Sequence, residues 1–250
     1  MNKFKSIIKF IFKKTGFVMV AEQYYKSLIH KNDVYAYGGL LLIKNFLGTK
    51  KKLLILDIGA NQGQTAKKLI ELFPFSDIHC FEPVSDTFKI LQENVKGIKN
   101  VHLHNCAFGS EQSDKIIYYQ ANSEWNSLSS RINVKPFTDE KSEIIKVNTI
   151  DNFVYINNIT KIHLLKSDTE GYELEVLSGA AKSLTNQIIN LIYIEVGFNK
   201  TDSQHNFWSE VIGFLNSYNY VFLGIHEVSF SREKKMEYGN AVFASKTFLV

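Results

Sequence analysis

The feature that most constrains the fold is a glycine-containing turn that directly follows a short apolar run. Residues 53–56 (Leu-Leu-Ile-Leu) have the character of a buried strand, Asp57-Ile58-Gly59-Ala60-Asn61-Gln62-Gly63 follows, and a helical pattern then begins. Glycines allow positive φ and a close approach of the backbone, and a helix start offers unpaired N–H groups. The sequence therefore predicts a strand–turn–helix unit whose turn binds a small molecule.

The residue types in this turn distinguish between ligands. A dinucleotide fingerprint reads G-x-G-x-x-G, but Asn61 stands at its second glycine and Asp57 ends the strand. A carboxylate there repels a pyrophosphate and suits a ligand with cationic groups and hydroxyl donors, such as S-adenosylmethionine. We expect this cofactor to bind at Asp57, Gly59, Asn61 and Gly63. A nicotinamide-dependent oxidoreductase is the alternative.

A second carboxylate stands in register with this turn. Residues 77–81 are predicted to form the next strand, and Glu82 ends it, 82 − 63 = 19 residues beyond Gly63. A carboxylate about 20 residues past the glycine turn is placed to accept hydrogen bonds from ribose hydroxyls. We therefore expect Glu82 to bind the ribose of the cofactor.

From residue 53 onward, strand and helix patterns alternate, which predicts an α/β fold with a doubly wound, mostly parallel sheet. Ligands bind such sheets beyond the carboxyl ends of the strands. The expected strands are residues 53–57, 78–81, 101–107, 116–119, 144–147, 162–167, 188–196, 220–224 and 241–245, and the expected helices are residues 62–72, 84–95, 149–157, 172–184 and 205–217.

Residues 1–48 are expected to form a helical extension, broken at 35–39, in front of a domain spanning residues 49–250. Within residues 1–20, apolar side chains share one helix face, and Lys5, Lys9 and Lys13 line the other. Such a basic amphipathic helix either packs on its own domain or makes a peripheral contact with an anionic membrane. The second reading leaves open a non-catalytic, membrane-associated partner in glycan assembly.

Composition narrows the partners and the compartment. The chain is 45% hydrophobic with a net charge of +4, and it has no basic stripe interleaved with aromatic residues, so we expect no nucleic-acid partner. No run approaches the ~18 apolar residues of a membrane span, and Cys80 and Cys106 suit free thiols in a reducing cytosol. We expect a cytoplasmic protein, at the inner face of the membrane if its N-terminal helix binds lipid, and the oligomeric state stays open.

A run of acids, Asp168, Glu170 and Glu173, directly follows one expected strand, and Glu195 lies near the end of the next. In a doubly wound sheet the first of these strands lies beside strand 53–57, so Asp168 should face the same crevice as Asp57. Glu195 should point there too, on the acceptor side. For Glu170 and Glu173 the alternative is a favourable interaction with a helix dipole.

Five segments give a family resemblance: D-I-G-A-N-Q-G, F-E-P, T-I-D-N-F, K-S-D-T-E-G-Y-E-L-E-V-L-S-G-A and I-Y-I-E-V, in this order. Between about residues 53 and 196 the chain resembles the FkbM-type S-adenosylmethionine-dependent methyltransferases, with D-x-E-G-x-E as the family-specific part. The resemblance implies a Rossmann-like class I fold with a seven-stranded sheet. It also implies O-methylation of a sugar, glycoconjugate or secondary metabolite. Ser167 and Thr169 depart from the aliphatic residues that usually flank Asp168.

An alcohol is a poor nucleophile at neutral pH, so a carboxylate within hydrogen-bond reach is expected to take its proton. Asp168 is the first candidate for this catalytic role and Glu170 the second. Clustered carboxylates also suit a divalent ion, which would replace a strong base, but the sequence assigns no metal ligands. Trp125, in the long polar segment 120–141, is expected to stack on the acceptor or on adenine, or else to pack at the surface.

Overall fold

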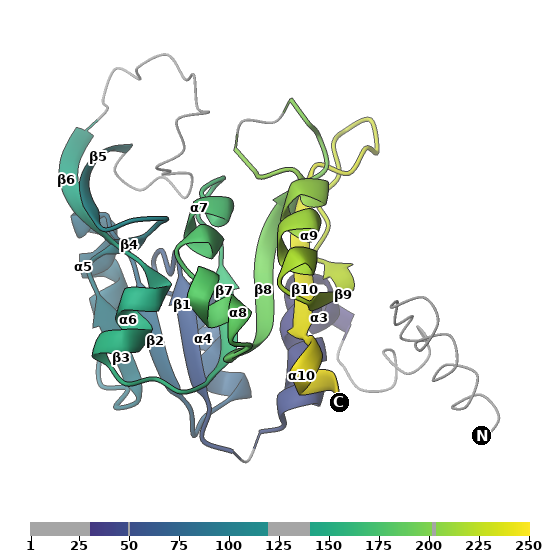
Figure 1. Cartoon of the computed structure of the whole chain (residues 1–250). Helices are drawn as coiled ribbons and strands as arrows, with labels where there is room; N and C mark the ends of the chain where they lie inside the picture. The colour runs from purple at the N-terminus through teal and green to yellow at the C-terminus, as the bar shows by residue number, and fades with distance from the viewer. Residues whose placement is uncertain (1–30, 50, 120–140, 202–203) are drawn as a thin grey trace.

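The computed structural model describes residues 31–49, 51–119, 141–201 and 204–250. A large sheet lies between two layers of helices, and a smaller sheet stands at its β3 side (Figure 1). Trp125 and residues 1–20 lie outside the described residues, so acceptor stacking by Trp125 and a peripheral membrane contact through residues 1–20 stay predictions.

The helices are α3 (Lys31–Leu47), α4 (Gln64–Leu72), α5 (Ser85–Asn94), α6 (Ile150–Ile156), α7 (Glu173–Ser178), α8 (Ala181–Thr185), α9 (Trp208–Ser217) and α10 (Lys246–Leu249). The strands are β1 (Leu54–Ile58), β2 (Asp77–Phe81), β3 (Val101–His104), β4 (Ala107–Phe108), β5 (Ser113–Tyr119), β6 (Lys141–Asn148), β7 (Ile162–Ser167), β8 (Ile189–Gly197), β9 (Tyr220–His226) and β10 (Tyr238–Ser245).

The large sheet has seven strands in the order β3-β2-β1-β7-β8-β10-β9, and β10 alone runs antiparallel to its neighbours. This confirms the predicted doubly wound, mostly parallel sheet. β1 pairs in parallel with β2 on one side and with β7 on the other. The direction of winding reverses between β1 and β7, and at such a switch point the loops that follow the strands separate and leave a crevice.

Each face of the sheet has its own apolar core, because the central strands are hydrophobic on both sides. Leu56 and Ile58 of β1 belong to the core beneath α6, α7, α8 and α9. Ile55 of the same strand belongs to the core beneath α3, α4 and α5. Burial on both faces fixes the level of β1 in the sheet, and with it the position of the turn that follows β1.

Helix α3 is part of the second core. Leu40 and Ile43 are fully buried, and the Gly39 N–H donates a 2.7 Å hydrogen bond to Glu227 Oε1 beyond β9. The helix is kinked at Tyr37, where φ is −147° and ψ is 29°, within the segment where the sequence predicts a break. These residues belong to the segment that the sequence assigns to an N-terminal helical extension, and the structure packs α3 against the sheet.

The predicted strand 101–107 is two strands in the structure. β3 ends at His104, and the chain then turns into β4 of the smaller sheet, whose order is β4-β6-β5. At the bend, the Asn105 side-chain amide donates 2.9 Å hydrogen bonds to the carbonyl oxygens of Glu82 and Pro83. These bonds pair two carbonyl groups of the chain that leaves β2, at the point where residue 105 turns away from the large sheet.

The predicted helix 172–184 is also two elements, α7 and α8. The break comes at Gly179, where a Cβ atom would lie 2.0 Å from the carbonyl oxygen of Gly109. The chain at this point therefore packs directly on another backbone segment. Helix α9 begins at Trp208 rather than at residue 205. In the preceding loop, Asn206 accepts hydrogen bonds through its backbone carbonyl from the Gly197 N–H and through its side-chain oxygen from the Leu174 N–H.

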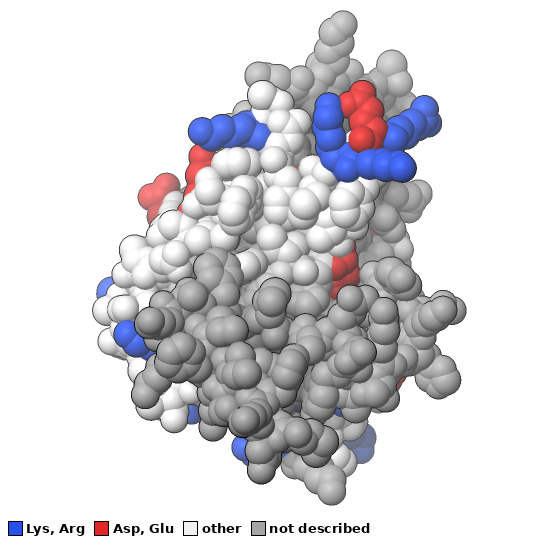
Figure 2. All heavy atoms as spheres, turned by 90° about the vertical axis from the view of Figure 1, so that its right-hand side faces the viewer, with Lys and Arg blue, Asp and Glu red and all other residues white. Residues whose placement is uncertain are grey.

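Figure 2 shows the side of the molecule that lies at the right of Figure 1. Its described surface is mostly uncharged, and charged side chains gather toward its upper end. The loop between β9 and β10 carries Arg232, Glu233, Lys234 and Lys235, and the ammonium of Lys235 lies 2.6 Å from Glu233. Within the described ranges, no helix combines the length and apolar character needed to cross a membrane.

Candidate functional site

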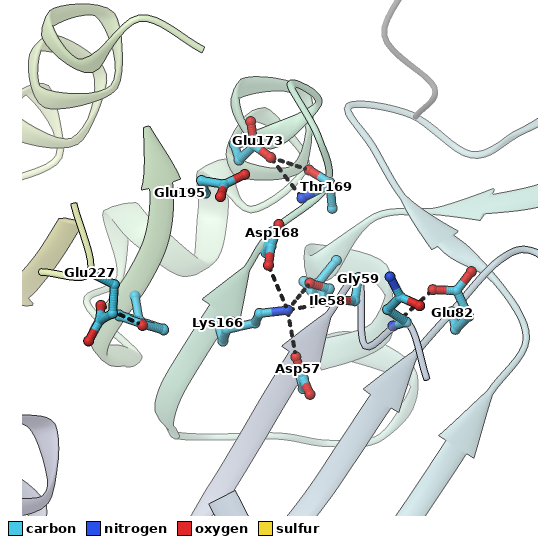
Figure 3. A network of polar contacts seen from close by, with 12 residues as sticks. Asp57, Ile58, Gly59, Glu82, Lys166, Asp168, Thr169, Glu173, Glu195 and Glu227 are labelled. Atoms are coloured by element: carbon cyan, nitrogen blue, oxygen red, sulfur yellow. Dashed lines mark hydrogen bonds and ion pairs between the residues drawn. The ribbon is translucent and has the colours of Figure 1, made fainter. Parts of the chain in front are cut away.

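The acids singled out in the sequence meet at the carboxyl edge of the large sheet (Figure 3). Asp57 lies in β1, Glu82 follows β2, Asp168 follows β7 and Glu195 lies in β8. These four strands are neighbours in the sheet, so side chains far apart in sequence converge at the switch point. The convergence of Asp57 with Asp168 that the strand order predicts is confirmed, with one residue between them that the sequence reasoning missed.

That residue is Lys166 of β7, which is paired in register with Asp57 of β1. Its ammonium lies 3.0 Å from Asp57 Oδ1 and 3.6 Å from Asp168 Oδ2. It also donates hydrogen bonds to the carbonyl oxygens of Gly59, at 2.8 Å, and Ile58, at 3.4 Å. One buried cation therefore ties the end of β1, the glycine turn and the start of the next loop together (Figure 3).

Burial governs the electrostatics of this pair. Asp57 has no exposed surface, and burial raises the pKa of its carboxyl group while Lys166 opposes the rise. Burial lowers the pKa of the Lys166 ammonium, but Asp57 and Asp168 outweigh it, so that its pKa is raised. Lys166 is therefore held as a cation. Because Asp57 is sealed beneath the turn, its closest partner is Lys166, and a direct contact with a ligand stays a prediction.

Gly59 is required by the loop beside the turn. Its φ is +71°, and a Cβ atom there would lie 1.8 Å from the carbonyl oxygen of Asp168. The N–H groups of Gly59 and Ala60 both donate to the carbonyl oxygen of Phe81, at 3.1 and 3.0 Å. The sequence explains this glycine by close approach of a ligand, and the structure adds close approach of the chain itself.

Gly63 is the N-cap residue of helix α4, at the end of the glycine turn. Its φ is +90°, and a Cβ atom there would lie 2.8 Å from Leu91 Cδ1 of α5. This glycine thus allows the two helices to pack closely. Gly63 is not among the residues that line the pocket described below, so its contact with a ligand also stays a prediction.

Glu82 links the turn to the chain after β2. Its Oε2 accepts a 3.0 Å hydrogen bond from the Asn61 N–H, and its Oε1 accepts one of 2.9 Å from the Val84 N–H. The side chain is 6% exposed, and burial raises the pKa of the carboxyl group to about 7, with the two N–H donors opposing the rise. A carboxylate has about four acceptor positions, so two remain for hydroxyl donors.

Residues 168–172, which we call the acid loop, are held by Glu173. Its Oε1 accepts hydrogen bonds from the Thr169 N–H at 2.7 Å, the Thr169 hydroxyl at 2.9 Å and the Gly171 N–H at 3.2 Å. Glu173 is 1% exposed, and burial raises its pKa to about 7. It stands in the first turn of α7, so the dipole interpretation is incomplete: this carboxylate fixes the shape of the acid loop.

The acid loop also contacts the chain that precedes α9. Glu170 and Gly171 have positive φ values of 53° and 91°, and a Cβ atom at Gly171 would lie 2.8 Å from the carbonyl oxygen of Gln204. This packing brings Glu170 toward Glu195 and toward His205, a residue that the sequence reasoning did not select. Glu195 Oε2 lies 3.5 Å from His205 Nε2.

Glu195 is 9% exposed. Burial raises the pKa of its carboxyl group well above the ordinary value, the charges of Asp168, Glu170 and Glu173 raise it further, and Lys166 opposes them. The surroundings of Glu195 thus form an acidic enclosure, in which Lys166 supplies the opposing positive charge.

A pocket of about 710 Å³, open solvent at its mouth included, lies between the glycine turn, Glu82 and the acid loop. Its polar wall holds Gly59, Asn61, Glu82, Asp168 and Glu170, and its apolar wall includes Phe81, Val84, Ala107, Phe108 and Tyr172. The side-chain oxygen of Asn61 is buried and has no hydrogen-bond partner among the described residues. The pocket therefore offers one unsatisfied acceptor, one carboxylate with acceptor positions to spare and an apolar wall for a planar ring.

Comparison with known proteins gives a family and two relatives. Residues 57–222 match the Methyltransferase FkbM domain. A protein called Methyltransferase 1 from Beauveria bassiana is 28% identical over 142 residues, or 50% of this chain and 57% of that protein. The 2-O-methyltransferase NoeI of Sinorhizobium fredii is 25% identical over 143 residues, or 52% of this chain and 58% of that protein. The matches thus span little more than half of each relative.

Among solved structures, TrmK of M. capricolum in complex with S-adenosylhomocysteine has a TM-score of 0.48 and 12% sequence identity. The likeness covers 83% of this chain and 68% of that one. Precorrin-6y C5,15-methyltransferase of Geobacter metallireducens has a TM-score of 0.46 and 13% identity, with 92% and 94% of the two chains covered. Likenesses this distant add nothing to the family match about the reaction.

The first prediction concerns Gly59. Gly59→Ala should destabilise the fold by about 4 kcal/mol or more, because the methyl group collides with a backbone oxygen and the residue keeps a left-handed φ. Gly97 has a φ of +83° with nothing within 4 Å of a Cβ, so Gly97→Ala should cost only about 1–2 kcal/mol. Urea unfolding of both variants measures the difference. Equal costs would show that the acid loop moves aside readily.

The second prediction concerns the buried cation. Lys166→Met should destabilise the protein by about 3–5 kcal/mol, because it leaves the Asp57 carboxylate buried without a counter-charge. In the double variant Asp57→Asn/Lys166→Met that charge is absent, so the double variant should be more stable than Lys166→Met alone. Denaturant unfolding tests both, with the exposed Lys161→Met as a matched control. A double variant that is less stable than the single one would contradict the assignment.

Proposed function

The chain belongs to the FkbM methyltransferase family, and we propose that it transfers a methyl group from S-adenosylmethionine to a hydroxyl oxygen of a sugar, glycoconjugate or secondary metabolite. Methyl transfer and S-adenosylmethionine as cofactor follow from the family, which removes the nicotinamide alternative. Oxygen as the methylated atom is our inference. It rests on the carboxylates that line one pocket with the proposed cofactor-binding residues, and on the similarity to the 2-O-methyltransferase NoeI.

The residues of the pocket fit S-adenosylmethionine. The unpartnered oxygen of Asn61 suits the ammonium group or a hydroxyl of the cofactor, and the remaining acceptor positions of Glu82 suit the ribose hydroxyls. Val84, Ala107 and Phe108 form an apolar wall that suits the adenine. We assign direct contacts to Gly59, Asn61 and Glu82.

We assign Asp57 and Gly63 an indirect part in cofactor binding, because they support the glycine turn. Asp57 holds Lys166, whose ammonium fixes the carbonyl groups of the turn, and Gly63 lets α4 pack on α5. Both residues shape the turn that the cofactor contacts.

The bound cofactor supplies a methyl group on a sulfonium, which is an electrophile, so the chain needs only to orient the acceptor and remove its proton. We assign removal of the acceptor hydroxyl proton to the Asp168 carboxylate. Asp168 would accept the hydroxyl proton as the acceptor oxygen takes the methyl group, and the sulfonium sulfur would leave as the neutral thioether of S-adenosylhomocysteine.

The position of Asp168 is the observation that carries this proposal. Its side chain is 37% exposed, lines the same pocket as Asn61 and Glu82, and is anchored from behind by Lys166 at 3.6 Å. A base must reach the acceptor while keeping a fixed orientation. Glu170 lines the pocket beside it, and we assign Glu170 and Glu195 to the acceptor side. For Trp125, stacking on the acceptor stays a prediction.

The third prediction concerns Glu82. Its pKa of about 7 lies above the ordinary value for glutamate, so the free protein carries this group mostly neutral below pH 7. Ribose hydroxyls donate to the charged form and favour it. Affinity for S-adenosylmethionine should therefore increase as pH increases, by roughly tenfold between pH 6 and pH 8, and level off above.

Calorimetry of the Glu82→Gln variant provides the test. This variant keeps the shape but should bind the cofactor more weakly by about 1.5–3 kcal/mol, and it should lose the pH dependence. Glu93→Gln removes an exposed carboxylate from α5 and should bind like the wild type. The same pH dependence in Glu82→Gln would assign it to another group.

The fourth prediction concerns the reaction. Asp168→Asn keeps the shape of the side chain and removes its basicity, and should lower kcat by about 10²–10⁴-fold. Cofactor affinity should change far less, because Asp168 serves the acceptor. The exposed Asp114→Asn on β5 is the matched control. Transfer of a radiolabelled methyl group to a panel of mono- and oligosaccharides and to a polar metabolite extract gives the rate.

Mass spectrometry and NMR of the labelled product identify the methylated atom. A methyl group on nitrogen or carbon would overturn the proposed O-methylation. Normal turnover by Asp168→Asn would place the base elsewhere, and Glu170 would then be the next residue to test.

A further inference from the structure

Three side chains on the acceptor side of the pocket have the composition of a metal site. Glu170 of the acid loop, Glu195 of β8 and His205 before α9 each bring one ligand atom to within 4.8 Å of the others. No other group of three histidine, cysteine, aspartate or glutamate side chains meets this condition in the described part of the chain. The family match and the proposed reaction assign no metal to these residues.

Glu195 supplies an independent sign that a ligand is missing. The residue is nine-tenths buried, and its Oε2 atom has no hydrogen-bond donor among the described residues. The Nε2 atom of His205 lies 3.5 Å from this oxygen. Burying a carboxylate oxygen without a donor is costly. An ion between Glu195 and His205 would satisfy that oxygen.

The charges around Glu195 also favour a cation. Asp168, Glu170 and Glu173 act on it with the same sign, and Lys166 is the cation that opposes them. The Lys166 ammonium is already engaged by Asp57 at 3.0 Å and by backbone carbonyl groups. The enclosure therefore holds more negative than positive charge, and bound cations often supply the missing charge in such sites.

The fold keeps the three ligands in place from different elements. The Gly197 N–H at the end of β8 donates a 2.9 Å hydrogen bond to the Asn206 carbonyl oxygen, which ties the loop before α9 to the strand of Glu195. The Asn206 side chain accepts a 3.0 Å hydrogen bond from the Leu174 N–H of α7, next to the acid loop. The ring of His205 stacks on Tyr238 at 4.7 Å. The ligands are thus positioned without a metal.

We propose that Glu170, Glu195 and His205 bind one divalent transition-metal ion, of the class of Mn²⁺ or Zn²⁺. Two carboxylates with one imidazole suit these ions, whereas Mg²⁺ and Ca²⁺ prefer oxygen ligands alone. An ion about 2.1 Å from each ligand needs ligand atoms no more than about 4.2 Å apart, so the side chains would close by at most about 0.6 Å. Three protein ligands leave coordination positions open.

Those open positions lie next to the pocket, because Glu170 is one of its lining residues. An acceptor hydroxyl bound there would have a lowered pKa, and this consequence rests on the proposed function. Ion binding itself requires no methyl transfer, so a direct binding measurement succeeds or fails independently of the reaction.

The test uses the full chain without an affinity tag, stripped of metal with a chelator. Isothermal titration with ZnCl₂, and electron paramagnetic resonance with MnCl₂, should each give one site per chain, and MgCl₂ at the same concentration should give none. Glu170→Gln, Glu195→Gln and His205→Asn should each weaken binding by at least about tenfold. Glu237→Gln removes an exposed carboxylate near Tyr238 and should leave the affinity unchanged.

Glu170→Gln is the decisive variant, because Glu170 is less buried than the other two ligands and its substitution is the least demanding on folding. S-adenosylmethionine affinity, measured on the same preparations, should stay at the wild-type value in this variant. Absence of Mn²⁺ and Zn²⁺ binding, or unchanged binding in both Glu170→Gln and Glu195→Gln, would overturn the metal site. If the wild-type protein does not bind S-adenosylmethionine, the proposed function is contradicted, and the result of the metal titration still holds.

Discussion

The candidate site is organised around one buried ammonium group. Lys166 reaches from β7 across to the end of β1, where it meets Asp57, Asp168 and the carbonyl oxygens of the glycine turn. A charge in the interior needs a partner and hydrogen bonds, and here each partner comes from a different part of the site. The glycine turn and the acid loop are therefore fixed by the same residue.

The carboxylates around this cation divide into supporting and exposed groups. Asp57 and Glu173 are almost completely buried, and they hold the turn and the acid loop from behind. Glu82 is also buried, but it keeps acceptor positions that face the pocket. Asp168 and Glu170 are more exposed and line the same pocket. Asp168, Glu170 and Glu173 form one run of acids in the sequence, but in the structure Glu173 is buried whereas the other two are more exposed.

Close backbone packing explains why the two halves of the site meet. Gly59 allows the glycine turn to rest on the carbonyl group of Asp168, and Gly171 allows the acid loop to rest on the carbonyl group of Gln204. A methyl group at either position would push the neighbouring chain away. The two glycines therefore bring the glycine turn, the acid loop and the loop before α9 together, and a sequence motif does not show these contacts.

The sequence by itself determined the sheet, the turn and the acids. Alternating apolar runs and helical patterns gave the doubly wound sheet, because strands buried on both faces and helices with one apolar face have distinct local patterns. The glycine turn and Glu82 could be placed because their spacing follows from one strand–helix–strand unit. The segment with Asp168, Glu170 and Glu173 could be placed because it ends a strand beside β1.

Only the tertiary structure decided which side chains meet. Lys166 stands in an apolar strand, and its charge was a signal that something must pair with it, but the partner Asp57 depends on the register between β1 and β7. His205 carries no local signal, since its approach to Glu195 comes from the loop before α9 folding onto the end of β8. Local patterns encode elements, whereas contacts between distant residues depend on packing that a single sequence does not express.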